Sequence, residues 1–160
     1  MQLTAQGLLA INTPKGWERA QGPGLLFFLR KNDKQETAPV WIYVNTFDCP
    51  SKSKSEHQSD FQACVASDVA GFRDRFKQAK VRLETPVELS AAHVDAVAYT
   101  FESGEEHNAF ERVVYVPDVN QVLILDLSAT NAASFQEALP TFNDFVQSYR
   151  GSIQPGSPDK

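Results

Sequence analysis

Asp126 is the ionisable residue whose setting most favours a functional role. It interrupts the stretch VLILDLSA, which is otherwise apolar and reads as a strand. A lone carboxylate is costly to bury, so a central Asp126 needs a partner, and Arg112 on the preceding strand is the expected one. Two interpretations stay open: a polar spot in a binding cleft, or a structural contact, which would be a salt bridge at a strand end or a turn contact. The structural interpretation is the favoured one.

The histidines form no recognisable catalytic or metal motif. His57, His93 and His107 fall in expected loops or strand starts, without H-E-x-x-H or H-x-H spacing. His107 with Glu105 and Glu106 is a conceivable metal site, but a solvated acidic loop explains the same residues and is favoured. The sequence also lacks G-x-S-x-G. We therefore expect no enzyme, no cofactor and no metal site.

The two cysteines, Cys49 and Cys64, have a spacing that matches no zinc motif. Cys49 is expected at the end of a strand and Cys64 on the apolar side of the following helix. A disulfide between them would stabilise the fold by about 3 kcal/mol for a loop of this size, provided that the protein is in an oxidising compartment. Two buried thiols acting as small hydrophobic side chains are the alternative.

Apolar patterning predicts the strands that would position these residues. Residues 122–129 are apolar on both sides and should form a central strand, whereas Pro86 places the alternating stretch 81–89 at a sheet edge. Further strands are expected at residues 7–12, 25–29, 40–47, 94–101 and 110–116.

Aromatic residues are concentrated in the first third of the chain. Within 40–47, Trp41, Tyr43 and Phe47 should point to one side of the strand, and the aliphatic residues between them to the other. Together with Trp17 and the pair Phe27–Phe28, these rings should form core. Any that face outward would make an apolar patch for a partner.

Two helices are expected. Residues 60–79 carry a single apolar stripe at helical spacing, composed of Phe61, Val65, Val69, Phe72 and Phe76. The apolar residues from 135 to 149 also recur at helical spacing, but Pro140 cannot lie deep inside one continuous helix without losing a hydrogen bond. We therefore predict a short turn over 131–139 and a second helix that starts near Pro140 and ends at Gly151.

These elements predict the fold class α+β, with an antiparallel sheet of about six to seven strands flanked by two main helices. At 160 residues the chain should form a single domain over 1–151, followed by a flexible tail over 152–160. The net charge of −5, with scattered lysines and arginines, disfavours a basic groove for nucleic acid. No apolar run approaches the roughly 18 residues of a membrane-spanning helix.

The sequence resembles the Mog1/PsbP-like superfamily, which includes bacterial PsbP-related and DcrB-like proteins. The resemblance covers nearly the whole chain, although its marks are turns, core aromatics and helix starts. Four stretches carry it: LLAINTPKGW, DVAGFRDRF, ERVVYVPDVNQVLILDLSA and FQEALPTFNDFVQSY.

Members of this superfamily include an extrinsic photosystem subunit, a Ran-binding transport factor and secretion-system chaperones. The resemblance thus implies an accessory or binding protein rather than an enzyme. It transfers no functional residue to this chain. Many bacterial relatives are exported or lipid-anchored, so we expect a periplasmic or otherwise extracytoplasmic protein in which Met1 replaces a removed signal peptide. A cytoplasmic protein is the alternative, because MQLTAQ itself is not a signal peptide.

Three hypotheses about function follow. The first is a non-enzymatic accessory protein of a bacterium that acts through contacts with an unknown protein partner. The second is a carrier or chaperone for an apolar ligand or segment, held in a cavity between the sheet and the helix at 60–79. The third and most remote is a small enzyme centred on Asp126 and Arg112.

Overall fold

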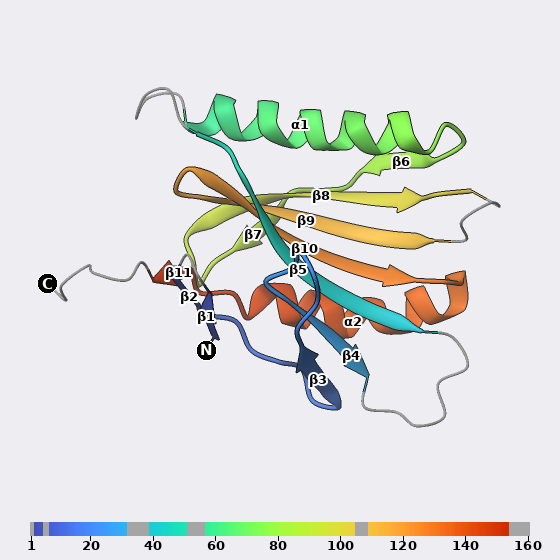
Figure 1. Cartoon of the computed structure of the whole chain (residues 1–160), viewed down its shortest axis with the longest axis horizontal. Coiled ribbons are helices and arrows are strands. Elements are labelled where there is room, and N and C mark those ends of the chain that lie inside the picture. Colours follow the sequence, from blue (N-terminus) through green and yellow to red (C-terminus); the bar gives the residue numbers. More distant parts are fainter. Residues whose placement is uncertain (1, 5–6, 32–38, 51–56, 105–108, 154–160) are drawn as a thin grey trace, which may run out of the picture.

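The computed structural model describes residues 2–4, 7–31, 39–50, 57–104 and 109–153. Within these residues a main sheet of eight strands carries one helix on each face, and a small sheet of three strands joins the two ends of the chain (Figure 1). The main sheet has the order β3-β4-β5-β10-β9-β8-β6, with β7 also paired to β8, and its pairs are antiparallel. The predicted α+β class is confirmed.

The elements have the following bounds in chain order. The strands before the first helix are β1 Gln2–Thr4, β2 Gly7–Leu9, β3 Trp17–Ala20, β4 Phe27–Lys31 and β5 Val40–Asp48. The rest are α1 His57–Arg75, β6 Lys80–Leu83, β7 Val87–Leu89, β8 Val94–Glu102, β9 Phe110–Asp118, β10 Gln121–Ala129, α2 Ala132–Gln147 and β11 Ser152–Ile153.

Strand β10 lies in the middle of the main sheet, as predicted. It pairs along its full length with β5 on one side and β9 on the other. The turn from β9 to β10 consists of Val119 and Asn120, and Asn120 adopts a φ of 57°, a left-handed conformation that asparagine tolerates better than most residues. The tight turn fixes the register of the two strands.

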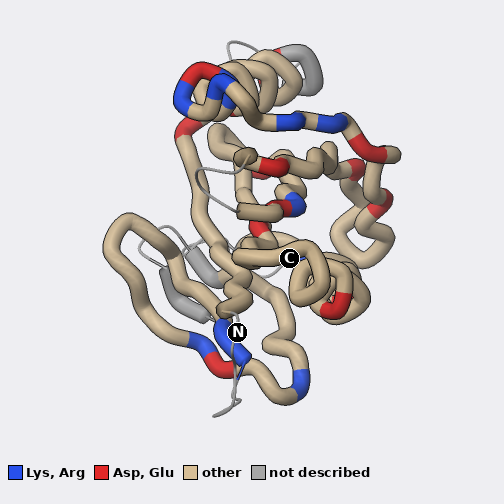
Figure 2. Tube along the Cα trace, turned by 90° about the vertical axis from the view of Figure 1, so that its right-hand side faces the viewer, with Lys and Arg blue, Asp and Glu red and all other residues tan. Residues whose placement is uncertain are grey.

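The alternation predicted for β5 is confirmed and divides the core in two. Val40, Ile42 and Val44 are buried on the face that α2 covers. Phe47 packs into the core under α1 on the opposite face. Trp41 and Tyr43 are separated from Phe47 by even numbers of residues, so they lie on the same face of the sheet as Phe47. Each helix therefore covers its own apolar layer on one face of the sheet. Figure 2 shows the two helices on either side of the strands.

The sheet edges depart in detail from the prediction. The stretch at 81–89 forms two short strands, β6 and β7, on either side of Pro86, and both pair with β8. The edge placement of this stretch is confirmed. At the other edge β3 pairs with β4, although no strand was predicted there. Its sequence WERA contains two charged residues in four, so it shows no apolar alternation.

Helix α1 is fastened to the sheet by packing and by a covalent bond. Phe61, Val65 and Val69 are buried against the sheet. A disulfide joins Cys64 in α1 to Cys49, the residue that follows β5. The bond fixes the first half of α1 at the end of the sheet where β5 finishes.

The prediction of a helix break at Pro140 is wrong. A single helix, α2, runs through this residue, and Asn131 caps its start because Asn131 Oδ1 accepts a hydrogen bond of 2.8 Å from the Ser134 N–H. Pro140 is exposed, so the carbonyl that loses its intrahelical partner is on the solvent side. The buried face holds the helix together on both sides of the proline, through Phe135, Ala138, Phe142, Phe145 and Val146.

The prediction of a flexible tail over 152–160 is wrong for its first two residues. Ser152 and Ile153 form β11, which pairs with β2 in the small sheet, and β2 in turn pairs with β1. The Ala10 N–H also donates to the Gly151 carbonyl at 3.1 Å, and the Arg150 N–H donates to the Ala10 carbonyl at 2.9 Å. Residues 154–160 lie outside the described part of the chain.

Candidate functional site

Part of the main sheet extends beyond α1 and exposes aromatic rings. The core under α1 draws residues from β5, β6, β8, β9 and β10 but, within the described residues, none from β3 or β4. Figure 1 shows β3 and β4 at the opposite end of the sheet from α1. On this face, which neither helix covers in the described part of the chain, Phe28, Trp41 and Tyr43 are half-buried, with ring centroids 6.4 Å apart for Phe28–Tyr43 and 6.3 Å for Trp41–Tyr43. We call these three residues the aromatic shelf.

A cavity of about 350 Å³ lies next to the shelf, between α1 and strands β8, β9 and β10. We call it the carboxylate pocket, because Asp68 of α1, Glu111 of β9 and Asp126 of β10 all line it. Aromatic and aliphatic residues and one arginine complete the lining: Phe72, Arg75, Phe76, Phe101, Val113, Tyr115 and Ile124.

Asp126 connects the shelf to the pocket. It lies opposite Tyr43 on β5 and opposite Val113 on β9, so these three side chains share one face of the sheet. The residue as a whole is half-buried, but its carboxyl group is enclosed, and Oδ1 has no hydrogen-bond partner within the described part of the structure. Burial, reinforced by the charges of Glu111 and Asp68, raises the pKa of Asp126 well above its usual value.

The other two carboxylates of the pocket are held in place by their neighbours. The Tyr115 hydroxyl donates a hydrogen bond of 2.8 Å to Asp68 Oδ2 across the gap between β9 and α1. Burial and this hydrogen bond raise the pKa of Tyr115. Burial also raises the pKa of Glu111, although Ser128 and Arg75 partly offset the effect. The pocket therefore combines buried acidic groups with a fixed hydroxyl.

The predicted pairing of Asp126 with Arg112 is wrong. In the β9–β10 register Asp126 is opposite Val113, and Arg112 is opposite Leu127, so the two side chains point to opposite faces of the sheet. Arg112 lies on the α2 side, where its Nη1 donates to Asn143 Oδ1 at 2.9 Å. A site that needs both residues together is not formed.

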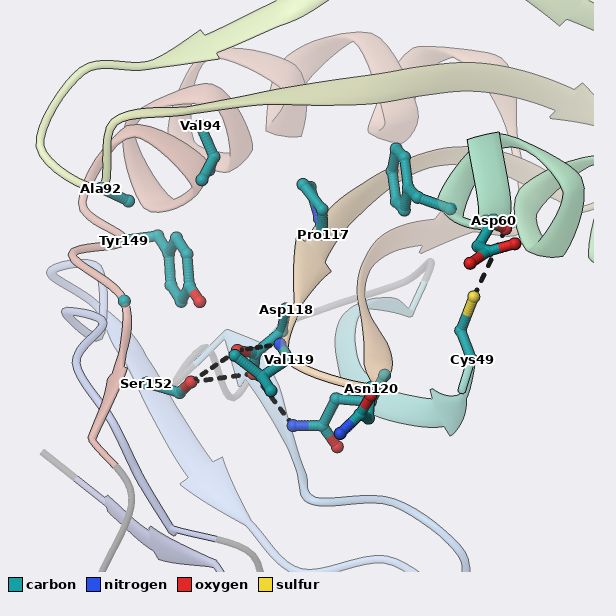
Figure 3. A pocket seen from close by; sticks show the side chains of 13 residues that line it. Cys49, Asp60, Ala92, Val94, Pro117, Asp118, Val119, Asn120, Tyr149 and Ser152 are labelled. Atoms are coloured by element: carbon teal, nitrogen blue, oxygen red, sulfur yellow. Dashed lines mark hydrogen bonds between the residues drawn. The ribbon is translucent and has the colours of Figure 1, made fainter. Parts of the chain in front are cut away.

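A second hollow, of about 410 Å³, lies at the opposite end of β9 and β10 (Figure 3). Its principal acid, Asp118, accepts hydrogen bonds from the Val119 N–H, from Gln121 Nε2 and from Ser152 Oγ, at 2.7 to 2.9 Å. Burial and then the Asp118 charge raise the pKa of Tyr149, which faces this hollow, to about 12. Because the bonds of Asp118 hold the β9–β10 turn and β11 together, we assign this hollow a structural role.

His93 lines neither hollow. His93 is exposed in the turn before β8, with a φ of 55°. His57 is the first residue of α1, and His107 lies outside the described residues together with Glu105 and Glu106. Across the part of the chain that the structure describes, no group of three or more histidine, cysteine or acidic residues could hold a metal ion.

Sequence reasoning missed Asp68 and Glu111. A signal for Asp68 was present, because it lies four residues after Cys64 and four before Phe72, on the apolar face of the helix. Glu111 lies on the same face of β9 as Val113 and Tyr115, but its proximity to Asp126 depends on the register of β9 and β10. Only the assembled sheet brings these acids together.

The architecture is similar to that of two solved structures. The first is cyanobacterial PsbP (CyanoP) from Synechocystis, at 14% identity and a TM-score of 0.55, with 92% of this chain and 94% of that chain covered. The second is LpqN of Mycobacterium tuberculosis, described as involved in cell envelope biogenesis, at 11% identity and a TM-score of 0.57, with 93% and 86% covered. No protein-family model matches the sequence, and comparison with curated proteins gives no significant match.

These likenesses confirm the PsbP/Mog1-like fold that the sequence motifs predicted. At this level of identity they establish the fold alone. Neither helix that the structure describes is long and apolar enough to cross a membrane.

Proposed function

Starting from the PsbP/Mog1-like fold of this chain, we propose that it is a non-enzymatic accessory protein that binds a protein partner on the face of its sheet that carries the aromatic shelf. The observation that carries this proposal is the aromatic shelf: Phe28, Trp41 and Tyr43 stand side by side on a face where α1 does not reach. Tyrosine and tryptophan are enriched in protein interfaces because a large apolar ring is combined with a polar tip.

The lining of the carboxylate pocket argues against the carrier hypothesis. A cavity does lie between the sheet and the helix predicted at 60–79, as that hypothesis requires. However, an apolar ligand placed there would offer no hydrogen-bond donor to the unpartnered Asp126 Oδ1 and would exclude water from Asp68 and Glu111, which is unfavourable. We therefore do not favour carriage of an apolar ligand at this position.

The enzyme hypothesis loses its geometric basis. It required Asp126 and Arg112 in one pocket, whereas the register places them on opposite faces of the sheet. In the second hollow the Asp118 carboxylate is already engaged by three donors, and the pKa of Tyr149 is raised away from neutrality.

We also propose that the protein works outside the cytoplasm, in a bacterial envelope or secreted. The Cys49–Cys64 disulfide supports this location, because such bonds persist mainly in oxidising compartments.

Site-specific photo-crosslinking in the native host tests the proposed interface. The variant carries the photoreactive residue p-benzoylphenylalanine in place of Trp41, and the matched control carries it in place of Gln136, an exposed residue of α2. We expect a discrete protein adduct from the Trp41 position and none from the Gln136 position, with the partner identified by mass spectrometry. Equal adducts from both positions, or none from Trp41, would contradict the proposal.

A further inference from the structure

The carboxylate pocket holds an acid that the fold leaves unsatisfied. Asp126 lies in the second half of the central strand β10, and its Oδ1 is enclosed without a hydrogen-bond partner among the described residues. A buried acceptor that lacks a donor costs free energy, and this cost is recovered when a donor binds. A cationic donor recovers the most, because charge-assisted hydrogen bonds are the strongest.

The surroundings of Asp126 favour a cation over any other ligand. Glu111 and Asp68 contribute further negative charge to its environment and raise its pKa. Arg75 lines the same pocket, and its charge partly offsets the rise in the pKa of Glu111. However, the ion pairs formed among the described residues do not include Arg75. Arg75 therefore does not provide the missing partner of Asp126.

Two aromatic residues of β5 lie beside Asp126 on the same face of the sheet. Tyr43 is directly opposite Asp126 in the sheet, and Trp41 is opposite Ser128, the next residue of β10 on the same face. The charges of Asp126 and Glu111 add to burial in raising the pKa of Tyr43, so the Tyr43 hydroxyl lies within their influence. Carboxylates beside tyrosine and tryptophan rings suit a guanidinium or ammonium group, which can both pair with an acid and lie over a ring.

From this geometry we infer that the carboxylate pocket receives the cationic side chain of an arginine or lysine belonging to the protein partner that docks on the aromatic shelf. The inference rests on the proposed function and specifies the chemistry of the partner. The shelf would take the apolar part of the partner's segment, and Asp126, with Glu111 beside it, would take its charge. A cavity of about 350 Å³ suits a single long side chain better than a large cofactor.

Calorimetric titration with synthetic peptides tests this inference. The probe is a short acetylated and amidated peptide that contains arginine beside a leucine. Its control is the same peptide with citrulline, the uncharged isostere, in place of arginine. We expect the intact protein to bind the arginine peptide about tenfold more tightly than the citrulline peptide, because the charge-assisted hydrogen bond is lost with citrulline.

Matched variants locate the binding to the pocket. Asp126→Asn and Glu111→Gln should each weaken binding of the arginine peptide about tenfold, because one charged acceptor is removed. Asp144→Asn removes the same charge from an exposed position on α2 and should leave the affinity unchanged. Two pocket variants are used so that a folding defect in one, detected by thermal unfolding, does not decide the result.

Three outcomes would overturn the inference. Equal weakening by Asp126→Asn and Asp144→Asn would show that only the overall negative charge attracts the peptide. Equal binding of the arginine and citrulline peptides would show that the shelf binds apolar groups alone. Binding of free agmatine as tightly as the peptide would assign the pocket to a small amine.

The two proposals can fail separately. If the crosslink at Trp41 forms and Asp126→Asn leaves it unchanged, the proposed interface stands and the cationic side chain is excluded. If the crosslink never forms, the proposed function fails whatever the peptides show.

Discussion

Asp126 is a residue whose burial should reduce the stability of the fold. The side chains that surround it or contribute to its electrostatic environment are Tyr43 of β5, Glu111 and Tyr115 of β9, and Asp68 and Arg75 of α1. Most of these groups are acids or phenols, and Arg75 forms no ion pair among the described residues. The net effect is that the pKa of Asp126 is raised, so ionising this carboxyl group costs more free energy in the folded protein than in the unfolded chain.

The raised pKa of Asp126 determines how the stability of the fold changes with pH. Because burial raises the pKa of Asp126 in the folded protein, the unfolded chain loses this proton first as the pH rises past about 3.9, and stability falls from there. Asp126→Asn cannot ionise, so it should raise the free energy of unfolding at pH 7 by about 1–2 kcal/mol, the scale of one unsatisfied buried group. The gain should shrink towards zero below about pH 4.

Urea unfolding at several pH values measures this difference. Asp144→Asn, on the exposed side of α2, serves as the control and should show little change at any pH. A destabilised Asp126→Asn at pH 7 would mean that the ionised carboxylate is satisfied in the folded state.

At the scale of residues, the sequence allowed only part of the site to be predicted. Asp126 stood out because an acid within VLILDLSA has no periodic explanation. Its partner was predicted wrongly because a shift of one residue in register moves a side chain to the other face of a sheet, and register cannot be read from two apolar stretches alone. Asp68 is distant in sequence from Asp126, so only tertiary packing brings it near.

At the scale of elements, Pro140 is the main departure from local rules. It lies inside α2 and lacks the N–H that would bond to the carbonyl four residues earlier. The apolar residues on both sides of it pack against the sheet, and this packing outweighs the local cost.

Pro140→Ala should therefore stabilise the protein. We expect a gain of about 1–2 kcal/mol in the free energy of unfolding. This is less than the roughly 3 kcal/mol between proline and alanine in a helix interior, because proline also restricts the unfolded chain by up to about 1 kcal/mol. Gln136→Ala, at an exposed position of the same helix, should change stability by only a few tenths of a kcal/mol. A loss of stability in Pro140→Ala, measured by urea unfolding, would show that the helix depends on the proline.

Most elements could be predicted because their patterns are strong. The alternation in β5 and the apolar stripe of α1 each specify one buried face, and both were located correctly. Strand β3 was missed because a short, charged edge strand has no such pattern. The continuity of α2 was missed because tertiary packing, which the sequence does not display, overrides the effect of one proline.

At the scale of the whole molecule, the Cys49–Cys64 bond ties a helix to the sheet that it covers. The two residues are 15 positions apart, and the bond limits the conformations of the unfolded chain between them. Reduction should therefore lower the free energy of unfolding by about 3 kcal/mol. The same reductant should have no effect on the double variant Cys49→Ala, Cys64→Ala, which should already be weaker by a similar amount. Equal unfolding midpoints for oxidised and reduced protein would contradict this prediction.

The small sheet of β1, β2 and β11 determines how the protein could be tethered. It brings both ends of the described chain to one end of the molecule, and the bond from Ser152 to Asp118 connects that end to the β9–β10 turn (Figures 1 and 3). Glu111 lies 7 residues before Asp118, near the start of β9, and Asp126 lies 5 residues after Gln121, the partner of Asp118, in the second half of β10. A tether at either terminus would thus hold the molecule by one end and leave the carboxylate pocket directed away from the point of attachment.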